Sequence, residues 1–124
     1  MRLLLDTQVM LWWHLDDPRL RTDTRGLLCT SPCVVSVASI WEVAIKHRLG
    51  KLEVPPAVFR DLSLASGAAL LPVLDGHVVE TACLPLLHHD PFDRLLIAQT
   101  RVEGLMAVSA DGQWPGYDVS LHRV

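Results

Sequence analysis

The sequence has 124 residues, half of them hydrophobic and 20% charged, with a formal net charge of −3. This size suits one compact domain over residues 1–124, and the hydrophobic content argues against intrinsic disorder. The net charge excludes a protein that holds nucleic acid by a basic surface alone. The longest apolar runs are shorter than the ~18 residues of a membrane span, so we expect no membrane helix and a cytoplasmic location.

The first half of the chain alternates between short apolar runs and helix-like segments. Residues 2–5 (RLLL) favour a buried strand that ends at Asp6. Residues 8–15 favour a helix, and Pro18 suits the first turn of a second helix. Residues 33–35 favour a strand, and Ser36 is a natural N-cap for a helix that ends at Gly50.

The second half continues this alternation. A helix is expected from Pro56 to about residue 66, then a strand over 69–73 and a short helix over 75–84. The strongest helix signal has Asp90 as the cap, Pro91 at the first position and Gly104 at the end. Strands are expected over 105–109 and 118–122. The pattern indicates an α/β domain whose largely parallel sheet has helices on both faces.

Three cysteines, Cys29, Cys33 and Cys83, cannot all pair, and they lack familiar zinc-site spacing. We expect reduced, mostly buried thiols. His88 and His89 are interpreted as a solvated loop pair. Trp12 and Trp41 lie in apolar helical stripes and are expected in the core or an interface rather than stacked on bases.

Acidic residues recur where the predicted topology would bring them to one edge of the sheet. Asp6 and Asp111 follow strands, Asp90 and Asp93 lie in the first turn of a helix, and Glu42 lies in the second turn of another. Each also has a simpler interpretation. Asp6 and Asp111 can form turns, Glu42 can pair with a lysine four positions later, and Asp90 can cap its helix.

Several ionised carboxylates in one place repel one another and need a counter-charge. Oxygen ligands without an organised His or Cys set favour Mg²⁺ or Mn²⁺ over zinc. We therefore expect a divalent cation among these acids.

Four segments, LLLDT, SIWEVAIKHRLGKL, HHDPFDRLLIAQ and VSAD, resemble in order and spacing the PIN-domain family, specifically VapC-type endoribonuclease toxins of type II toxin-antitoxin modules. Gln8 stands where many of these relatives carry His. The resemblance implies a PIN-like three-layer domain with a five-stranded, largely parallel sheet, a Mg²⁺ or Mn²⁺ pocket, and cleavage of single-stranded regions of RNA. It also implies a cognate antitoxin that inhibits the toxin, and a homodimer or a heterotetramer or larger complex with that antitoxin.

The expected site consists of Asp6, Glu42, Asp93 and Asp111. The first three would hold the ion, and Asp111 would orient water or recruit a second ion. Five further residues would support the site or contact substrate: Thr7 and Ser109 as hydrogen-bond donors, Asp90 beside the acids, and Arg94 and Lys46 as cations for RNA phosphates.

Three other functions compete with this hypothesis. A Mg²⁺-binding signalling receiver domain needs an acidic pair after the first strand and a lysine after a late strand, but Asp6 is single and VSAD has no lysine. A phosphatase with an aspartyl nucleophile needs a second acid where Gln8 stands. A non-catalytic PIN-like binding module stays open.

Overall fold

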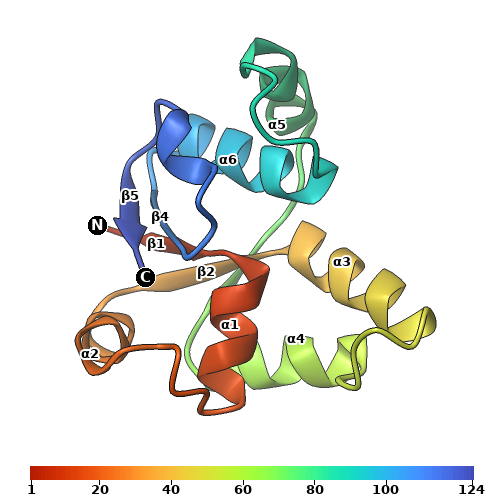
Figure 1. Ribbon diagram of the computed structural model, residues 1–124, viewed down its shortest axis with the longest axis vertical. Coiled ribbons are helices and arrows are strands. Elements are labelled where there is room, and N and C mark those ends of the chain that lie inside the picture. The colour runs from red at the N-terminus through yellow and green to blue at the C-terminus, as the bar shows by residue number, and fades with distance from the viewer.

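Five parallel strands form a single sheet in the order β3-β2-β1-β4-β5 in the computed structural model, which describes residues 1–124 (Figure 1). The strands are β1 (Leu3–Leu5), β2 (Cys33–Ser36), β3 (Ala69–Leu71), β4 (Met106–Ser109) and β5 (Leu121–Arg123). The first strand of the chain is therefore the central strand, with β2 on one side and β4 on the other.

Six α-helices connect and cover the strands. They are α1 (Thr7–His14), α2 (Thr22–Thr30), α3 (Val37–Arg48), α4 (Pro56–Ala65), α5 (Asp75–Glu80) and α6 (Pro91–Glu103). Two short 3-10 turns, Thr81–Cys83 and Trp114–Gly116, lie in the later connections. No helix combines the length and the apolar character needed to cross a bilayer.

Alternating side chains of the strands build a core on each face of the sheet. Leu3 and Leu5 pack with residues of α1, α2, α3 and α4, among them Phe59. Leu4 points to the opposite face and packs with Leu96 and other residues of α6. The α/β prediction is confirmed, and the domain has three layers, with α1, α2 and α4 on one side of the sheet and α6 on the other (Figure 1).

Local capping explains where the two helices that carry predicted site residues begin. The Ser36 side chain accepts a hydrogen bond from the Ala38 backbone N–H (3.0 Å) at the start of α3. Asp90 caps α6, Pro91 occupies its first turn, and Gly104 ends it with a left-handed φ of 63°.

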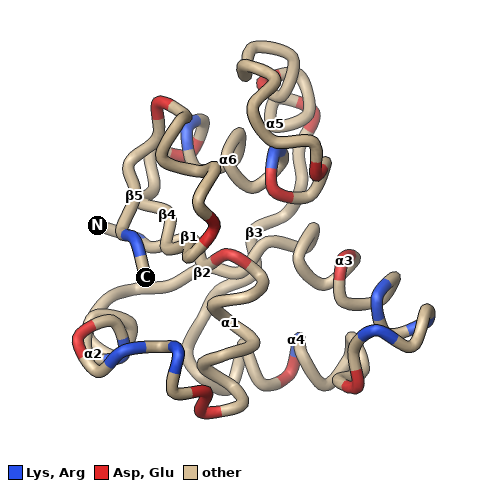
Figure 2. The backbone as a smooth tube through the Cα atoms, in the orientation of Figure 1, with Lys and Arg blue, Asp and Glu red and all other residues tan.

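Because all strands run in the same direction, their carboxyl ends meet at one edge, where α1, α3 and α6 begin. Figure 2 shows that acidic positions of α3, of α6 and of the segments that follow β1 and β4 lie near one another along the chain trace at this edge. The fold thus supplies the geometry that the site prediction needs.

Several element boundaries differ from the prediction, among them the end of the third strand, at Leu71 instead of residue 73, and the end of α5, at Glu80 instead of residue 84. Two further differences have a local cause. Pro18 does not begin a helix, because Asp17 accepts hydrogen bonds from the backbone N–H (2.9 Å) and guanidinium of Arg19 and closes a turn; α2 begins at Thr22. The last strand begins at Leu121 rather than at residue 118, because the backbone turns where Val119 N–H donates to the Tyr117 carbonyl.

The burial of two residue types also differs from the prediction. All three cysteines are free, but Cys29 and Cys83 are exposed and only Cys33 is buried, so the prediction of mostly buried thiols is wrong. Trp41 is 61% exposed and forms a T-shaped ring contact with Phe92, so of its two predicted locations the core is wrong and an interface stays a prediction.

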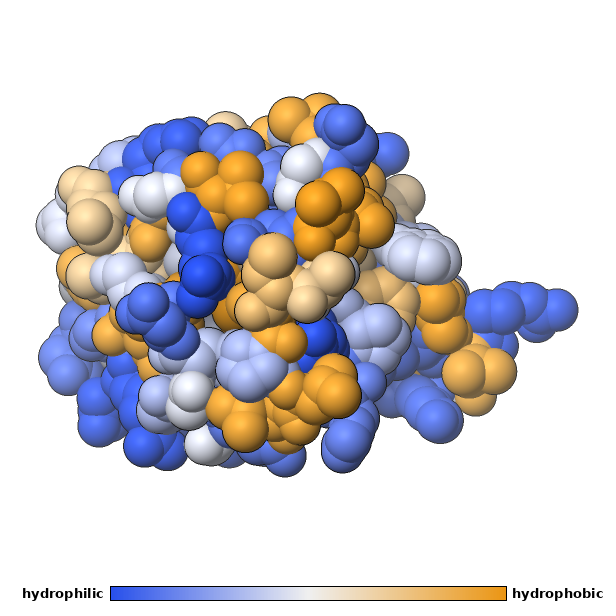
Figure 3. All heavy atoms as spheres, turned by 90° about the horizontal axis from the view of Figure 1, so that it is seen from above, coloured by the Kyte–Doolittle hydropathy of each residue, from blue (hydrophilic) through white to orange (hydrophobic).

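Apolar side chains remain exposed on α5 and on the segment that follows it. Val78, Val79, Leu86 and Leu87 all fall in this region and are exposed. Figure 3, which looks down on the molecule from the α5 side, shows apolar groups gathered among polar ones. Exposed apolar groups of this kind are typical of surfaces that meet another protein.

Candidate active site

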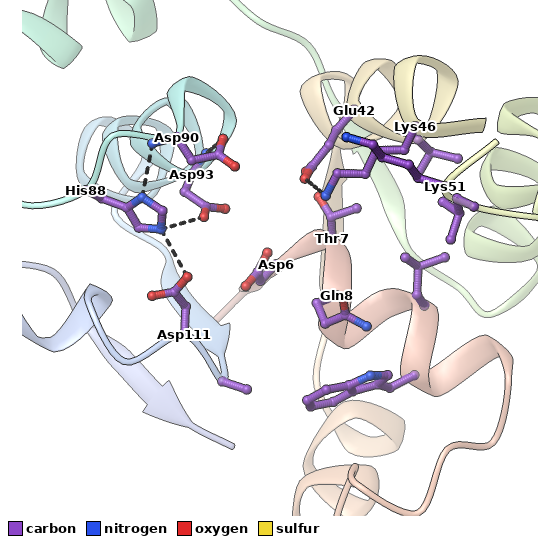
Figure 4. Close-up of a pocket in the computed structure, with 15 residues that line it drawn as sticks. Asp6, Thr7, Gln8, Glu42, Lys46, Lys51, His88, Asp90, Asp93 and Asp111 are labelled. Carbon is purple, nitrogen blue, oxygen red and sulfur yellow. Dashed lines mark hydrogen bonds and ion pairs between the residues drawn. The ribbon is translucent and has the colours of Figure 1, made fainter. Parts of the chain in front are cut away.

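A pocket of about 630 Å³ lies at the carboxyl edge of the sheet and is lined by residues of α1, α3 and the start of α6 (Figure 4). All four acids expected to form the site line it: Asp6, Glu42, Asp93 and Asp111. In Figure 4, Asp6 lies between Glu42 on one side and Asp93 with Asp111 on the other. The structure therefore brings the four acids together, and their catalytic roles stay a prediction.

Asp6 directly follows the central strand and is 6% exposed. Burial raises its pKa to about 6; a hydrogen bond from Ser109 acts in the opposite direction, and the charge of Glu42 adds to the increase. Ser109 Oγ donates to Asp6 Oδ2 (2.8 Å) and accepts from the Asp111 backbone N–H (3.1 Å). Ser109 thus supports Asp6 as predicted and also connects it with Asp111.

Glu42 is 5% exposed, and its two carboxylate oxygens have different surroundings. Oε2 accepts a hydrogen bond from Lys46 Nζ (2.8 Å), whereas Oε1 is buried and has no partner. Lys46 is thus engaged by Glu42, the pairing that the simpler interpretation of Glu42 expects. An unpaired buried carboxylate oxygen is costly, so Oε1 calls for a cation or a donor from outside the protein.

Asp93 lies in the first turn of α6 and is 8% exposed. Burial raises its pKa to about 8, and the charges of Asp6 and Asp90 add to the increase. The acid is therefore mostly protonated at neutral pH when no cation is bound. A bound cation would favour the ionised form and oppose this shift.

His88 connects Asp93 and Asp111. Its Nε2 lies 2.8 Å from Asp93 Oδ2 and 3.0 Å from Asp111 Oδ2, and its Nδ1 accepts a hydrogen bond from the Asp90 backbone N–H (3.1 Å) (Figure 4). An accepting Nδ1 carries no proton, so the ring proton is on Nε2 and points at both carboxylates. Its side chain is only 12% exposed, and the interpretation of His88 as solvated surface is wrong.

Two influences act on the protonation of His88. Partial burial lowers its pKa, but the hydrogen bond with Asp111 and the charges of Asp93 and Asp111 raise it by more. The Asp90 N–H opposes the imidazolium form, because protonated Nδ1 would place two N–H groups against each other. A metal-bound histidine usually donates its other ring N–H, which His88 cannot do here. His88 is thus better suited to hold two carboxylates than to bind a metal.

The residues present fit a divalent cation. Carboxylate oxygens from four separate elements converge, two of the acids have raised pKa values, and Glu42 Oε1 lacks a partner. This set of oxygen donors has the chemistry that Mg²⁺ and Mn²⁺ prefer.

The supporting residues differ in how well they match the prediction. Thr7 lines the pocket, but its hydroxyl donates to Ser39 Oγ (2.8 Å) instead of to an acid. Asp90 accepts hydrogen bonds from the first backbone N–H groups of α6, as a cap does, and also lines the pocket.

Arg94 does not line the pocket, so the structure does not bring it together with the acids, and its contact with RNA phosphates stays a prediction. Its guanidinium donates to the carbonyl oxygens of Thr81 (2.9 Å) and Pro85 (2.8 Å). The cause is helical geometry, because successive residues of a helix point about 100° apart and Asp93 already faces the pocket.

Four pocket residues with hydrogen-bonding side chains were not among the predicted site residues: Gln8, Trp12, Lys51 and His88. One sequence signal does identify His88, because it stands two residues before the Asp90 cap and thus beside the start of α6. Lys51 follows the end of α3 in a loop, where residue pattern gives no indication of direction.

Comparisons with known proteins agree with this architecture. The family described as PIN domain matches residues 3–119. No curated protein matches the chain.

Solved structures give matches over nearly the whole length. A chain of the VapBC2 complex of Rickettsia felis bound to a promoter DNA fragment is 14% identical, with 99% of this chain and 98% of that chain covered and a TM-score of 0.77. A chain of DNA-bound VapBC from Salmonella typhimurium is 14% identical, with 99% and 98% covered and a TM-score of 0.69. A chain of a toxin-antitoxin complex from Klebsiella pneumoniae is 12% identical, with 98% of each chain covered and a TM-score of 0.66. At these identities the likeness shows the fold.

Proposed function

Because the chain belongs to the PIN domain family, we propose that it is a metal-dependent endoribonuclease of the VapC toxin type that cleaves single-stranded regions of RNA. The observation that carries the proposal is the unpaired, buried Oε1 of Glu42 in a pocket with three further acids. The structural likeness to chains of VapBC complexes supports the toxin type.

In this proposal, Asp6, Glu42 and Asp93 hold Mg²⁺ or Mn²⁺. The cation supplies Lewis-acid chemistry, which lowers the pKa of water and offsets charge on the phosphate. Asp111 is the more solvent-exposed acid, and it orients the attacking water or helps to bind a second ion. The products carry a 3′-hydroxyl and a 5′-phosphate.

The neighbouring side chains keep these acids in place. Ser109 fixes Asp6 by donating to one of its oxygens, and His88 fixes the spacing of Asp93 and Asp111. Lys46 neutralises one oxygen of Glu42 and leaves the other without a partner. Such supporting contacts typically change metal affinity by about 10- to 100-fold when they are removed.

We further propose a cytoplasmic toxin whose partner is a cognate antitoxin, with the chain as a homodimer or as a heterotetramer or larger complex with that antitoxin. Exposed apolar side chains support a protein partner. Trp41, Ile45 and Leu49 follow one another at intervals of four along and just beyond α3 and are 61%, 38% and 63% exposed. Helix faces of this kind are usually covered by another chain.

The nuclease proposal is tested with Asp6→Asn and a defined single-stranded RNA. We expect cleavage by the wild type with Mg²⁺ or Mn²⁺, none with EDTA, and none by the variant at an unchanged far-ultraviolet spectrum. Asp61→Asn is the matched control, because Asp61 is exposed, lies on α4 and pairs with Arg60 outside the pocket. Full cleavage by Asp6→Asn would refute the assignment. A wild type that binds Mg²⁺ but cleaves no RNA would favour the non-catalytic binding module.

A further inference from the structure

Three residues that line the pocket carry hydrogen-bond donors that no protein group engages: Gln8, Trp12 and Lys51. In Figure 4, Gln8 and Lys51 lie on the same side of Asp6 as Glu42, across from Asp93. The Trp12 Nε1 atom is buried and has no acceptor. The side chains of Gln8 and Lys51 have no hydrogen-bond or ion-pair partner in the protein. We call these three residues the donor wall.

Trp12 is held in a fixed position. The Arg19 guanidinium carbon lies 4.8 Å from the centroid of its ring, a cation-π geometry, and Arg19 is itself held by Asp17 through two hydrogen bonds of 3.0 and 2.7 Å. The indole also packs against the core cluster beneath α1. Its N–H therefore does not need to be ordered when a ligand arrives, which favours binding.

The pocket contains two buried polar atoms without partners, and they require opposite ligands. Glu42 Oε1 is an acceptor that suits a cation, whereas Trp12 Nε1 is a donor that requires an acceptor. Of the two lysines in the sequence, Lys46 is occupied by Glu42, while Lys51 is free. A free ammonium beside unengaged neutral donors favours an anion with several acceptor oxygens, which is the chemistry of phosphate.

We propose that the donor wall binds a phosphate of the RNA strand next to the one that is cleaved. The inference rests on the proposed nuclease function, which assigns the cleaved phosphate to the cation held by Asp6, Glu42 and Asp93. A pocket of about 630 Å³ holds a ligand much larger than one phosphate. With one phosphate at the cation and its neighbour at the donor wall, the path of the strand through the pocket is fixed.

Binding of RNA tests the donor wall separately from cleavage. The background is Asp93→Asn, which retains the full chain and prevents hydrolysis if the nuclease proposal holds. Binding of a fluorescein-labelled single-stranded RNA octamer is followed by anisotropy over a series of salt concentrations. The control is Arg2→Gln, which removes an exposed, unpaired cation that precedes β1, away from the carboxyl edge.

The two substitutions in the wall should weaken binding in different ways. Lys51→Gln should lower affinity and reduce the slope of log affinity against log salt by about 0.7, the contribution of one phosphate contact on a single strand. Trp12→Phe should lower affinity about tenfold, the effect of one hydrogen bond to a charged group, and leave the slope unchanged. Arg2→Gln should change neither quantity.

Nuclear magnetic resonance gives a second, direct readout. The Trp12 indole N–H signal, assigned by its loss in Trp12→Phe, should shift when the octamer is added. The Trp114 indole N–H is the internal control, because it is also buried and unpaired but lies outside the pocket. Inorganic phosphate at the same concentration should produce a much smaller shift, which separates a strand from a free anion.

The outcomes separate this proposal from the nuclease proposal. Unchanged RNA affinity and slope in Lys51→Gln and Trp12→Phe, with cleavage by the wild type intact, would overturn the donor wall alone. If RNA shifts the Trp12 indole signal but the wild type does not cleave RNA, the nuclease proposal is overturned and RNA binding by the donor wall is supported. A shift with an acidic peptide and none with RNA would overturn the proposal in favour of a protein ligand.

Discussion

Replacing Asp93 by asparagine removes a carboxyl group that the pocket keeps protonated in the absence of a cation. Asparagine has the same shape, accepts the same hydrogen bond from His88, and cannot ionise. Without metal, we therefore expect Asp93→Asn to stabilise the protein, and to do so increasingly as the pH rises. With metal, the difference should narrow, because the variant loses a ligand and gains less stability from the cation.

The magnitude follows from the pKa of Asp93, which lies near 3.8 in the unfolded chain and at about 8 in the folded protein. Between these values the folded protein binds one more proton than the unfolded chain, so stability falls as pH rises. Each pH unit changes the free energy of unfolding by ~1.4 kcal/mol. From pH 5 to pH 8, the wild type should lose about 4 kcal/mol relative to the variant.

The assay is thermal unfolding of both proteins in EDTA at pH 5 and pH 8. At roughly 3 °C per kcal/mol, the difference in Tm should grow by about 10 °C between the two pH values. Mg²⁺ at 100 times its Kd should then raise the Tm of the wild type alone, by the equivalent of ~2.7 kcal/mol. A Tm difference that does not change with pH would refute the claim that burial keeps Asp93 protonated.

Four further predictions concern the same pocket. Glu42→Gln should abolish the Mg²⁺-dependent rise in Tm, and an undiminished rise would contradict the role given to Oε1. His88→Leu should lower the Mg²⁺ affinity measured by calorimetry about tenfold. His88→Gln should restore part of this affinity, and His89→Gln should leave it unchanged. Equal Mg²⁺ affinities in all three variants would contradict the role of His88 in holding Asp93 and Asp111. Ser109→Ala should raise the pKa of Asp6 in a carbonyl-carbon NMR titration, since it removes a hydrogen bond that lowers it. Cleavage by the wild type should increase from pH 5 to pH 8 as Asp6 and Asp93 ionise, and a rate that falls over this range would contradict the metal-ligand assignment.

The sequence predicts the fold well wherever a local rule and the overall topology agree. Asp90, Pro91 and Gly104 fix the limits of α6 by capping chemistry, which depends only on nearby residues. The second helix was predicted too early because a proline suits both a helix start and a turn. The hydrogen bond from the Arg19 backbone N–H to the Asp17 side chain stabilises the turn instead of a helix start, and the residue pattern does not reveal this contact.

The acids of the site were predictable because each lies at the end of a strand or near the start of a helix, and the parallel sheet places these ends together. His88 and the residues of the donor wall are not predictable in this way. They lie in loops or on a helix whose orientation depends on packing, and Trp12 was assigned from its apolar stripe to the core or an interface. An amphipathic ring can pack its body against the core and direct its N–H to a cavity, so hydrophobic periodicity alone does not separate these roles.

The central position of β1 has a consequence for the timing of activity during synthesis. Asp6 is translated 103 residues before Ser109, the group that fixes it. β1 also lacks its neighbour β4 until that point. While the ribosome is still translating, the growing polypeptide carries acids without a pocket to gather them. The pocket therefore assembles only after β4 and Ser109 have emerged, and any chemistry that depends on the gathered acids starts no earlier.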